Sequence, residues 1–152
     1  MAKIAICGYG IVGSGVAEVI AENADSISRN AAENVSIKYI LDSRDFPGDP
    51  FEEFVVHDFS IIENDPEVSV VIETIGGVGI AYEFTKRALL AGKSVVTSNK
   101  ELVATKGHEL IAIAKKKNLN YLFEASVGGG IPIIRPITQC LAANKIDEVY
   151  GI

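Results

Sequence analysis

The residues of this sequence best suited to chemistry begin with a glycine-rich turn near the N-terminus. It has the form G-x-G-x-x-G and consists of Gly8, Tyr9, Gly10, Ile11, Val12 and Gly13. An apolar run precedes the turn, and a segment of helical spacing follows it. In such a turn the first glycine permits a tight bend, the second lets a pyrophosphate approach, and the third lets helix pack closely on strand. The exposed N–H groups and the dipole at the helix start favour the phosphate charge. The turn therefore predicts a dinucleotide site.

A carboxylate that accepts hydrogen bonds from the ribose is expected at the end of the second strand. Asp42 follows the apolar run 35–41, further beyond Gly13 than the ~20 residues that this motif usually shows. Asp42 would accept hydrogen bonds from the ribose hydroxyls of NAD and repel the 2′-phosphate of NADP. Arg44 could instead attract that phosphate. The pair leaves NAD and NADP both open, with NAD favoured, and the alternative for Asp42 is a simple turn residue.

Two more strand ends carry polar residues and glycines. The run 68–73 is followed by Thr74, Gly76 and Gly77, and the run 94–97 ends at Thr97, followed by Asn99 and Lys100. In open parallel sheets, ligands bind at the carboxyl ends of the strands, so both segments should face the cofactor. The glycine pair would let the backbone approach the nicotinamide ribose, and Lys100 would place an amine near the reacting carbon.

The elements that must position these residues alternate along the chain. Strands are predicted at residues 3–7, 35–41, 54–56, 68–73, 94–97, 121–124 and 148–152. Helices are predicted at residues 11–23, 57–64, 81–91, 102–117 and 133–142, and residues 23–34 are predicted to be a helix end followed by a loop. Continuous apolar strands are buried on both faces, which indicates a parallel sheet covered by helices. The fold class is α/β, a Rossmann-like, doubly wound, mostly parallel sheet with helices on both faces.

Length and composition indicate one ordered domain and exclude several classes of protein. A chain of 152 residues fits one domain of ordinary size, and 48% hydrophobic residues exclude intrinsic disorder. A net charge of −6 argues against binding nucleic acid, and no apolar run is long enough for a membrane helix. No secretion signal opens the sequence. Two cysteines outside any CxxC pair indicate reduced, mostly buried thiols in a cytoplasmic protein.

A third glycine-rich segment supports a resemblance to a known family. It runs from Glu124 to Pro132 and reads E-A-S-V-G-G-G-I-P. Together with the G-x-G-x-x-G turn, an E-x-x-G-G strand end and a T-S-N-K strand end, it resembles homoserine dehydrogenase. The four motifs occur in the family's order and at similar spacing, from residue 8 to residue 132.

The resemblance implies an NAD(P)-dependent oxidoreductase that is cytoplasmic and dimeric when full length. Its substrates would be L-homoserine and L-aspartate 4-semialdehyde, interconverted by hydride transfer on the route to threonine, methionine and isoleucine. Lys100 matches the family lysine between cofactor and substrate, which gives electrostatic and proton-handling help. Glu124, Val127, Gly129 and Ile131 match positions that hold a sodium ion, largely through main-chain carbonyls. The alternative for these four is a turn that only shapes the segment.

The family continues beyond residue 152 into a catalytic domain. Residues 1–152 are therefore expected to form the NAD(P)-binding domain alone, to bind dinucleotide and to be inactive without the remainder. One alternative is a stand-alone NAD(P)-binding sensor without catalysis. Another is a related reductase, such as aspartate dehydrogenase or dihydrodipicolinate reductase, although neither is expected to carry both the T-S-N-K and E-A-S-V-G-G-G-I-P motifs.

Overall fold

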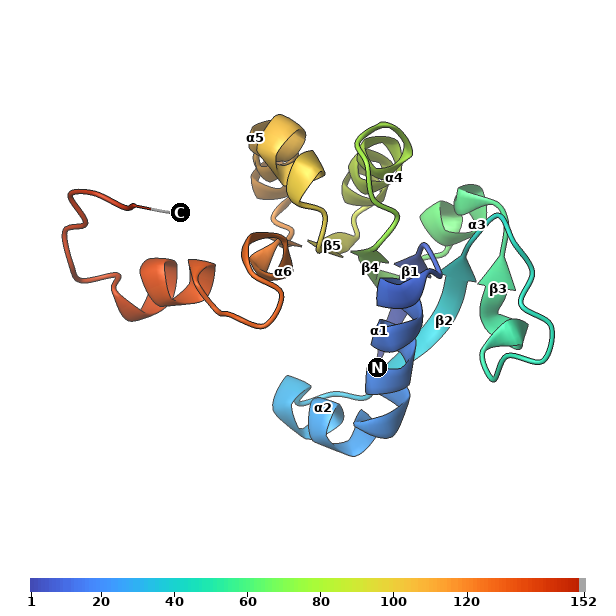
Figure 1. Ribbon diagram of the computed structural model, residues 1–152. Helices are drawn as coiled ribbons and strands as arrows, with labels where there is room; N and C mark the ends of the chain where they lie inside the picture. The colour runs from blue at the N-terminus through green and yellow to red at the C-terminus, as the bar shows by residue number, and fades with distance from the viewer. Residues whose placement is uncertain (151–152) are drawn as a thin grey trace.

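A parallel sheet is the centre of the computed structural model, which describes residues 1–150 (Figure 1). Its strands are β1 (Ala2–Cys7), β2 (Val35–Leu41), β3 (Val55–Val56), β4 (Val68–Glu73), β5 (Ser94–Thr97) and β6 (Tyr121–Leu122). They lie in the order β3-β2-β1-β4-β5-β6, and every neighbouring pair is parallel. The strand order reverses between β1 and β4, and ligands bind outside the carboxyl ends of the strands at such a point. The predicted doubly wound α/β class is confirmed.

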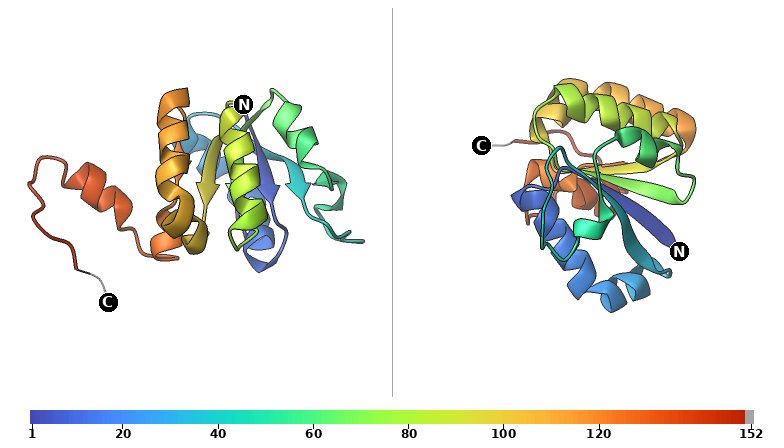
Figure 2. Two further views of the ribbon diagram at one scale, coloured as in Figure 1. Left: turned by 90° about the horizontal axis from the view of Figure 1, so that it is seen from above. Right: turned by 90° about the vertical axis from the view of Figure 1, so that its right-hand side faces the viewer.

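Helices cover both faces of the sheet, as Figure 2 shows. On one face lie α1 (Ile11–Glu22) and α2 (Ala24–Ala31), and on the other lie α3 (Phe59–Asn64), α4 (Gly79–Leu90) and α5 (Lys100–Lys117). Shorter helical segments are a 3₁₀ turn (Glu52–Phe54), α6 (Glu124–Val127) and a π-helical turn (Pro136–Cys140). Beyond α6 the chain extends away from the sheet (Figure 2).

The strand residues alternate between two hydrophobic clusters. Ala5, Cys7 and Leu41 pack in the larger cluster with apolar residues of α3, α4 and α5. Their neighbours Ile6 and Ile40 belong to the smaller cluster with α1. Since successive side chains of a strand point to opposite faces, this alternation places a core on each side of the sheet.

Several predicted elements differ from the structure. Residues 24–31 form α2 rather than a loop, a helix with Asp25 in its first turn and Arg29 in its last, which suits the helix dipole. The predicted strand 121–124 ends at Leu122, and α6 begins at Glu124. The predicted helix 133–142 is helical only at 134–140. Within the predicted strand 148–152, residues 148–150 are irregular, and residues 151–152 lie outside the described part.

The two cysteines differ in burial. Cys7 is buried as expected, whereas Cys140 is exposed, because the segment that carries it does not pack on the sheet.

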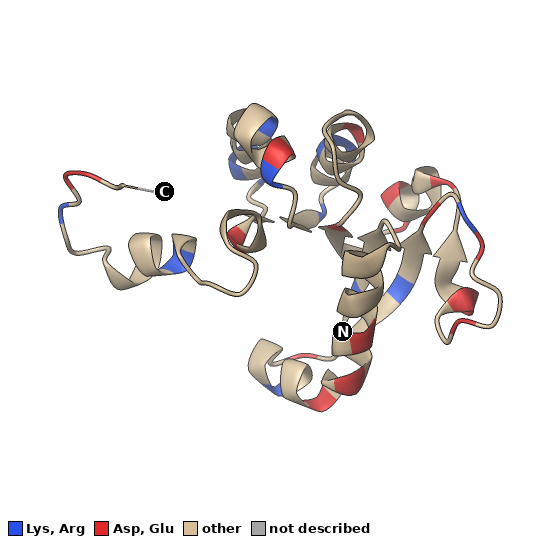
Figure 3. Ribbon diagram, in the orientation of Figure 1, with Lys and Arg blue, Asp and Glu red and all other residues tan. Residues whose placement is uncertain are grey.

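Acidic residues lie on α1, at the start of α2 and along the segment between β2 and α3 (Figure 3). Within residues 1–150, no helix has both the length and the apolar character needed to cross a bilayer.

Candidate functional site

The glycine-rich turn joins β1 to α1 and packs tightly against the end of β4. Gly8 has φ +97°, which L side chains rarely adopt, and its N–H donates to the carbonyl of Leu41 at 2.8 Å. The hydroxyl of Thr74 donates to the carbonyl of Gly8 at 2.8 Å. A Cβ added at Gly13 would lie 1.9 Å from the same carbonyl. Gly8 and Gly13 are therefore required by backbone conformation and by close packing.

The first turn of α1 presents free N–H groups. Gly10 precedes the helix and has no side chain to cap it, and no acidic residue lies in the first turn. A Cβ at Gly10 would meet nothing within 4 Å. Ile11 and Val12, which follow it, are 95% and 52% exposed. An uncapped, open helix N-terminus suits a phosphate anion, so these residues fit the pyrophosphate of a dinucleotide.

Asp42 lies beside this turn and holds it. Its carboxylate accepts a hydrogen bond from the N–H of Tyr9 at 2.8 Å. It also accepts from the backbone N–H and from the guanidinium of Arg44, at 3.0–3.1 Å. The Arg44 side chain is the main reason that the pKa of Asp42 falls to about 2, against the opposing effect of burial. Arg44 also donates to the carbonyl of Tyr9 at 3.2 Å. Both residues proposed to discriminate NAD from NADP thus contact the glycine-rich turn.

The carboxyl ends of β4 and β5 border a cavity of about 540 Å³, the larger of two beside the glycine-rich turn. Of the predicted site residues, it is lined by Val12, Thr74, Gly76, Gly77, Asn99, Lys100, Val127 and Gly129. Ser98, Glu101, Ala125, Ser126 and Gly128 complete the lining. All four motifs, far apart in sequence, therefore meet around one space. Thr97 is not part of the lining, because its hydroxyl donates to buried Glu73 at 2.5 Å.

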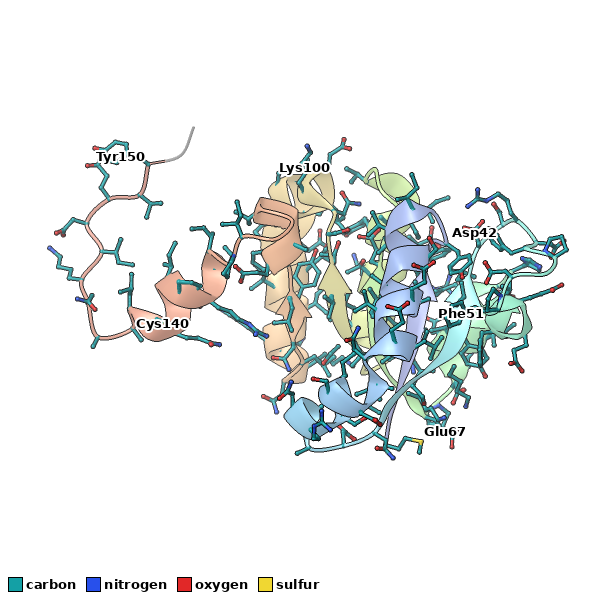
Figure 4. All side chains as sticks on the ribbon, turned by 60° about the horizontal axis from the view of Figure 1, so that its bottom comes forward. Asp42, Phe51, Glu67, Lys100, Cys140 and Tyr150 are labelled. Atoms are coloured by element: carbon teal, nitrogen blue, oxygen red, sulfur yellow. The ribbon has the colours of Figure 1, made fainter. Side chains whose placement is uncertain are left out.

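Lys100 is the first residue of α5 and is exposed. Asn99 caps the helix, since its side-chain oxygen accepts from the N–H of Leu102 at 3.0 Å. The cap fixes where α5 begins and so where Lys100 stands at the cavity. Figure 4 shows Lys100 and Asp42 toward the same end of the strands, with Glu67 toward the opposite end.

A smaller cavity of about 250 Å³ lies on the other side of the turn and was not predicted. Its lining is Gly8, Leu41, Asp42, Ser43, His57, Ile75, Ile80 and Phe84. Ile75 and Ile80 flank the glycine pair, and isoleucines in such a place look like ordinary core residues. His57 hydrogen-bonds through Nδ1 to the carbonyl of Asp42 at 2.8 Å, and this contact is the main reason that its pKa is raised. An apolar space beside Asp42 suits an adenine base.

The four residues expected to hold sodium lie on α6 and the turn after it. The carboxylate of Glu124 accepts from the N–H groups of Ile133, Ile134 and Arg135, so it anchors the following segment. The hydrogen bonds found within residues 1–150 leave the carbonyls of Val127, Gly129 and Ile131 without a donor. No cluster of three His, Cys, Asp or Glu side chains that could hold a metal occurs in that range. A cation here would depend on main-chain oxygens.

Known proteins resemble this chain in sequence and in structure. Homoserine dehydrogenase of Pseudomonas aeruginosa is 40% identical over 151 residues, which cover 99% of this chain and 35% of that protein. The Bacillus subtilis enzyme is 38% identical, with the same coverage. A crystal structure of homoserine dehydrogenase from Thiobacillus denitrificans superposes with a TM-score of 0.85 at 35% identity, over 94% of this chain and 34% of that one. For the S. aureus enzyme at pH 7.5 the TM-score is 0.77 at 32% identity, over 86% and 33%.

The chain thus spans about a third of the length of the curated relatives that it matches. The matched family is described as "Homoserine dehydrogenase, NAD binding domain", and the match covers residues 8–124, from the glycine-rich turn to the start of α6. On this sequence match and the shared fold, the chain belongs to the family of homoserine dehydrogenase NAD-binding domains.

Proposed function

We propose that this chain binds NAD(P) across the carboxyl edge of the sheet. The pyrophosphate lies on the N–H groups at the start of α1, the adenosine occupies the smaller cavity beside Asp42, and the nicotinamide enters the larger one beside Lys100. The observation that carries this proposal is the uncapped start of α1 behind Gly8 and Gly13, which leaves anion-binding N–H groups open.

We further propose that the chain serves a dehydrogenase that interconverts L-homoserine and L-aspartate 4-semialdehyde. Family membership supports this activity, and so does the larger cavity, whose lining includes Lys100. Residues 1–152 would form the NAD(P)-binding domain, with the catalytic domain contributed by chain outside this sequence. Dimer formation by the whole enzyme and a cytoplasmic location are predictions that follow from the family.

The chain's own residues have distinct tasks in this reaction. The bound nicotinamide supplies or accepts the hydride. The ammonium of Lys100 stands at the cavity wall, where it would stabilise negative charge on the substrate oxygen and carry the proton that this oxygen gains or loses. The turn at Gly76 and Gly77 forms another part of the wall of this cavity. A stand-alone sensor is not favoured, because it would have no use for Lys100 and the triple-glycine turn at the same cavity.

Sodium binding at the turn after α6 is a separate proposal. Its support is the set of undonated carbonyls at Val127, Gly129 and Ile131, which are hard oxygen ligands of the kind that such cations prefer. In this proposal Glu124 contributes by holding the following segment in place, and its carboxylate need not touch the ion. The ion would stiffen one wall of the larger cavity, which Val127 and Gly129 line.

Titration of NADH into the 152-residue chain tests the proposed binding. We expect a saturable change in NADH fluorescence, and no saturable binding of adenosine, which lacks the pyrophosphate. The same chain mixed with homoserine and NAD(P)⁺ should produce no NAD(P)H, because the substrate's amine and hydroxyl would lack partners. An NADH signal that never saturates would refute the binding site, and robust turnover would refute the assignment of catalysis to a further domain.

A further inference from the structure

A buried carboxylate lies behind the larger cavity, and the proposed function does not use it. Glu73 is the last residue of β4, and only 1% of it is exposed. It takes part in none of the ion pairs found within residues 1–150. A buried charge without a cation is unfavourable unless hydrogen-bond donors surround it. The hydrogen-bond donors around Glu73 therefore indicate which segments its carboxylate holds in place.

Three hydrogen-bond donors contact this carboxylate, two from the loop after β4 and one from the end of β5. Oε1 accepts from the N–H groups of Ile75 and Gly76, at 2.8 and 3.4 Å, in the loop after β4. Oε2 accepts from the hydroxyl of Thr97 at 2.5 Å, at the end of β5. An ionised carboxylate only accepts hydrogen bonds, so it suits a site made of donors alone. A glutamine would turn its NH₂ group toward one of them.

The hydrogen bonds continue into a closed ring. The Thr97 hydroxyl accepts from the N–H of Asn99 at 2.9 Å, and the side chain of Asn99 donates to the carbonyl of Gly77 at 2.6 Å. The ring therefore runs from Glu73 through Thr97 and Asn99 to Gly77, and back through the loop to Glu73. It ties the loop after β4 to the loop after β5.

Both loops carry the residues proposed to meet the nicotinamide. Gly76 and Gly77 have φ +82° and +66°, so the first loop holds a conformation that favours glycine. A Cβ added at either glycine would meet nothing within 4 Å, so no side chain packs there to hold the turn. Asn99 immediately precedes Lys100 and caps α5. Glu73 itself does not line the cavity. Its contacts can affect a ligand only through these two loops.

We propose that Glu73 is a positioning residue, which through Thr97 and Asn99 fixes the Gly76–Gly77 turn relative to Lys100 around the nicotinamide half of the dinucleotide. This inference rests on the proposed NAD(P) site and adds a residue to it. The smaller cavity proposed for the adenosine half is lined by Asp42 and His57, which lie outside the ring, and it meets the loop after β4 only at Ile75. Loss of the ring should therefore weaken a ligand that has the nicotinamide half more than one that lacks it.

The test compares NADH with ADP, which has the adenosine and the diphosphate but lacks both the second ribose and the nicotinamide. Thr97→Val removes the hydroxyl that joins Glu73 to Asn99 without changing the charge. We expect it to bind NADH about tenfold more weakly, as for a buried group left without its hydrogen bond, and to bind ADP as wild type does. Glu73→Gln should act in the same direction. Thr97→Ser keeps the hydroxyl and should restore NADH affinity. Isothermal titration calorimetry on the 152-residue chain measures both ligands.

Thr85→Val is the matched control. Thr85 is also buried, at 1% exposure, and its hydroxyl has no partner within residues 1–150, so the same substitution should change neither affinity. If Glu73→Gln does not fold, Thr97→Val carries the test. Variants that bind NADH as wild type does, or that lose both ligands equally, would overturn the positioning role and leave the proposed function standing. A wild-type chain that binds neither ligand would overturn both.

Discussion

At the scale of single residues, Asp42 combines two tasks that are usually described separately. Its carboxylate holds the N–H of Tyr9 inside the glycine-rich turn, and it faces the guanidinium of Arg44. With its pKa lowered to about 2, the carboxylate is ionised at neutral pH. The hydroxyls of an NAD ribose would compete with Arg44 for the carboxylate oxygens of Asp42. The 2′-phosphate of NADP could instead bind the guanidinium of Arg44 in place of that carboxylate.

Asp42→Ala should therefore separate the two cofactors. We expect NADH affinity to fall about tenfold, because charge-assisted hydrogen bonds to the ribose are lost. NADPH affinity should hold or rise, since the repulsive carboxylate is gone and Arg44 is free. Fluorescence titration of both ligands measures this, with Asp25→Ala on exposed α2 as the control. An equal loss for NADH and NADPH would mean that Asp42 acts only by holding the turn.

The site residues differ in how visible they are in the sequence. Gly8 and Gly13 could be predicted, because their roles depend on the local path of the chain. The part played by Glu73 could not, since it depends on Thr97, 24 residues away, and a buried acid looks like any strand-end acid. Ile75 and Ile80 at the smaller cavity were missed for a similar reason, because an apolar ligand pocket and an apolar core use the same residue types.

At the scale of elements, the seat of α1 on β1 determines whether the site exists. Gly13→Ala would place a methyl group 1.9 Å from the carbonyl of Gly8 and 3.0 Å from the hydroxyl of Thr74. The helix must move, so we expect a loss of about 1–3 kcal/mol in unfolding free energy together with loss of NADH binding.

Gly15→Ala, two residues further into the same helix, is the matched comparison. Nothing lies within 4 Å of the added methyl group, so the variant should keep NADH affinity and gain up to about 1 kcal/mol. Urea unfolding and NADH titration of both variants check the pair. Equal behaviour of the two would show that packing at Gly13 is not what shapes the turn.

The elements that the sequence predicted well are those with continuous apolar runs. β1, β2, β4 and β5 were found nearly to the residue, because burial on both faces leaves such a run no other place. Residues 23–34 are predicted as a helix end followed by a loop because they are mostly polar; in the structure residues 24–31 form α2, and none of them is buried. Residues 133–142 have a helical apolar pattern, yet only residues 134–140 are helical. None of the residues 133–142 is buried, so no packing against the sheet supports a longer helix.

At the scale of the whole molecule, the two cavities lie on either side of one turn. Gly8 lines the smaller cavity and Val12 the larger, so a ligand that fills both bridges β1, β2, β4 and β5. Such a ligand contacts only the folded chain, because the unfolded chain brings none of these segments together. Binding is therefore linked to global stability.

NADH at one hundred times its dissociation constant should raise the unfolding free energy by about 2.7 kcal/mol. For a chain of this size that corresponds to a rise of about 5–10 °C in melting temperature. Differential scanning fluorimetry or circular dichroism measures it, with adenosine at the same concentration as the control. An unchanged melting temperature, despite saturated fluorescence, would place NADH on a surface that unfolding does not disrupt.

The hydrogen bonds from Thr74 to the glycine-rich turn also have a consequence for folding during translation. The hydroxyl of Thr74 holds the carbonyls of Cys7 and Gly8, which precede it by 67 and 66 residues. During translation the first βα unit emerges early but lacks this partner until the fourth strand has left the ribosome. A nascent chain halted before that point carries the whole phosphate-binding motif without this hydrogen bond, so we expect nucleotide binding to assist folding only late in synthesis.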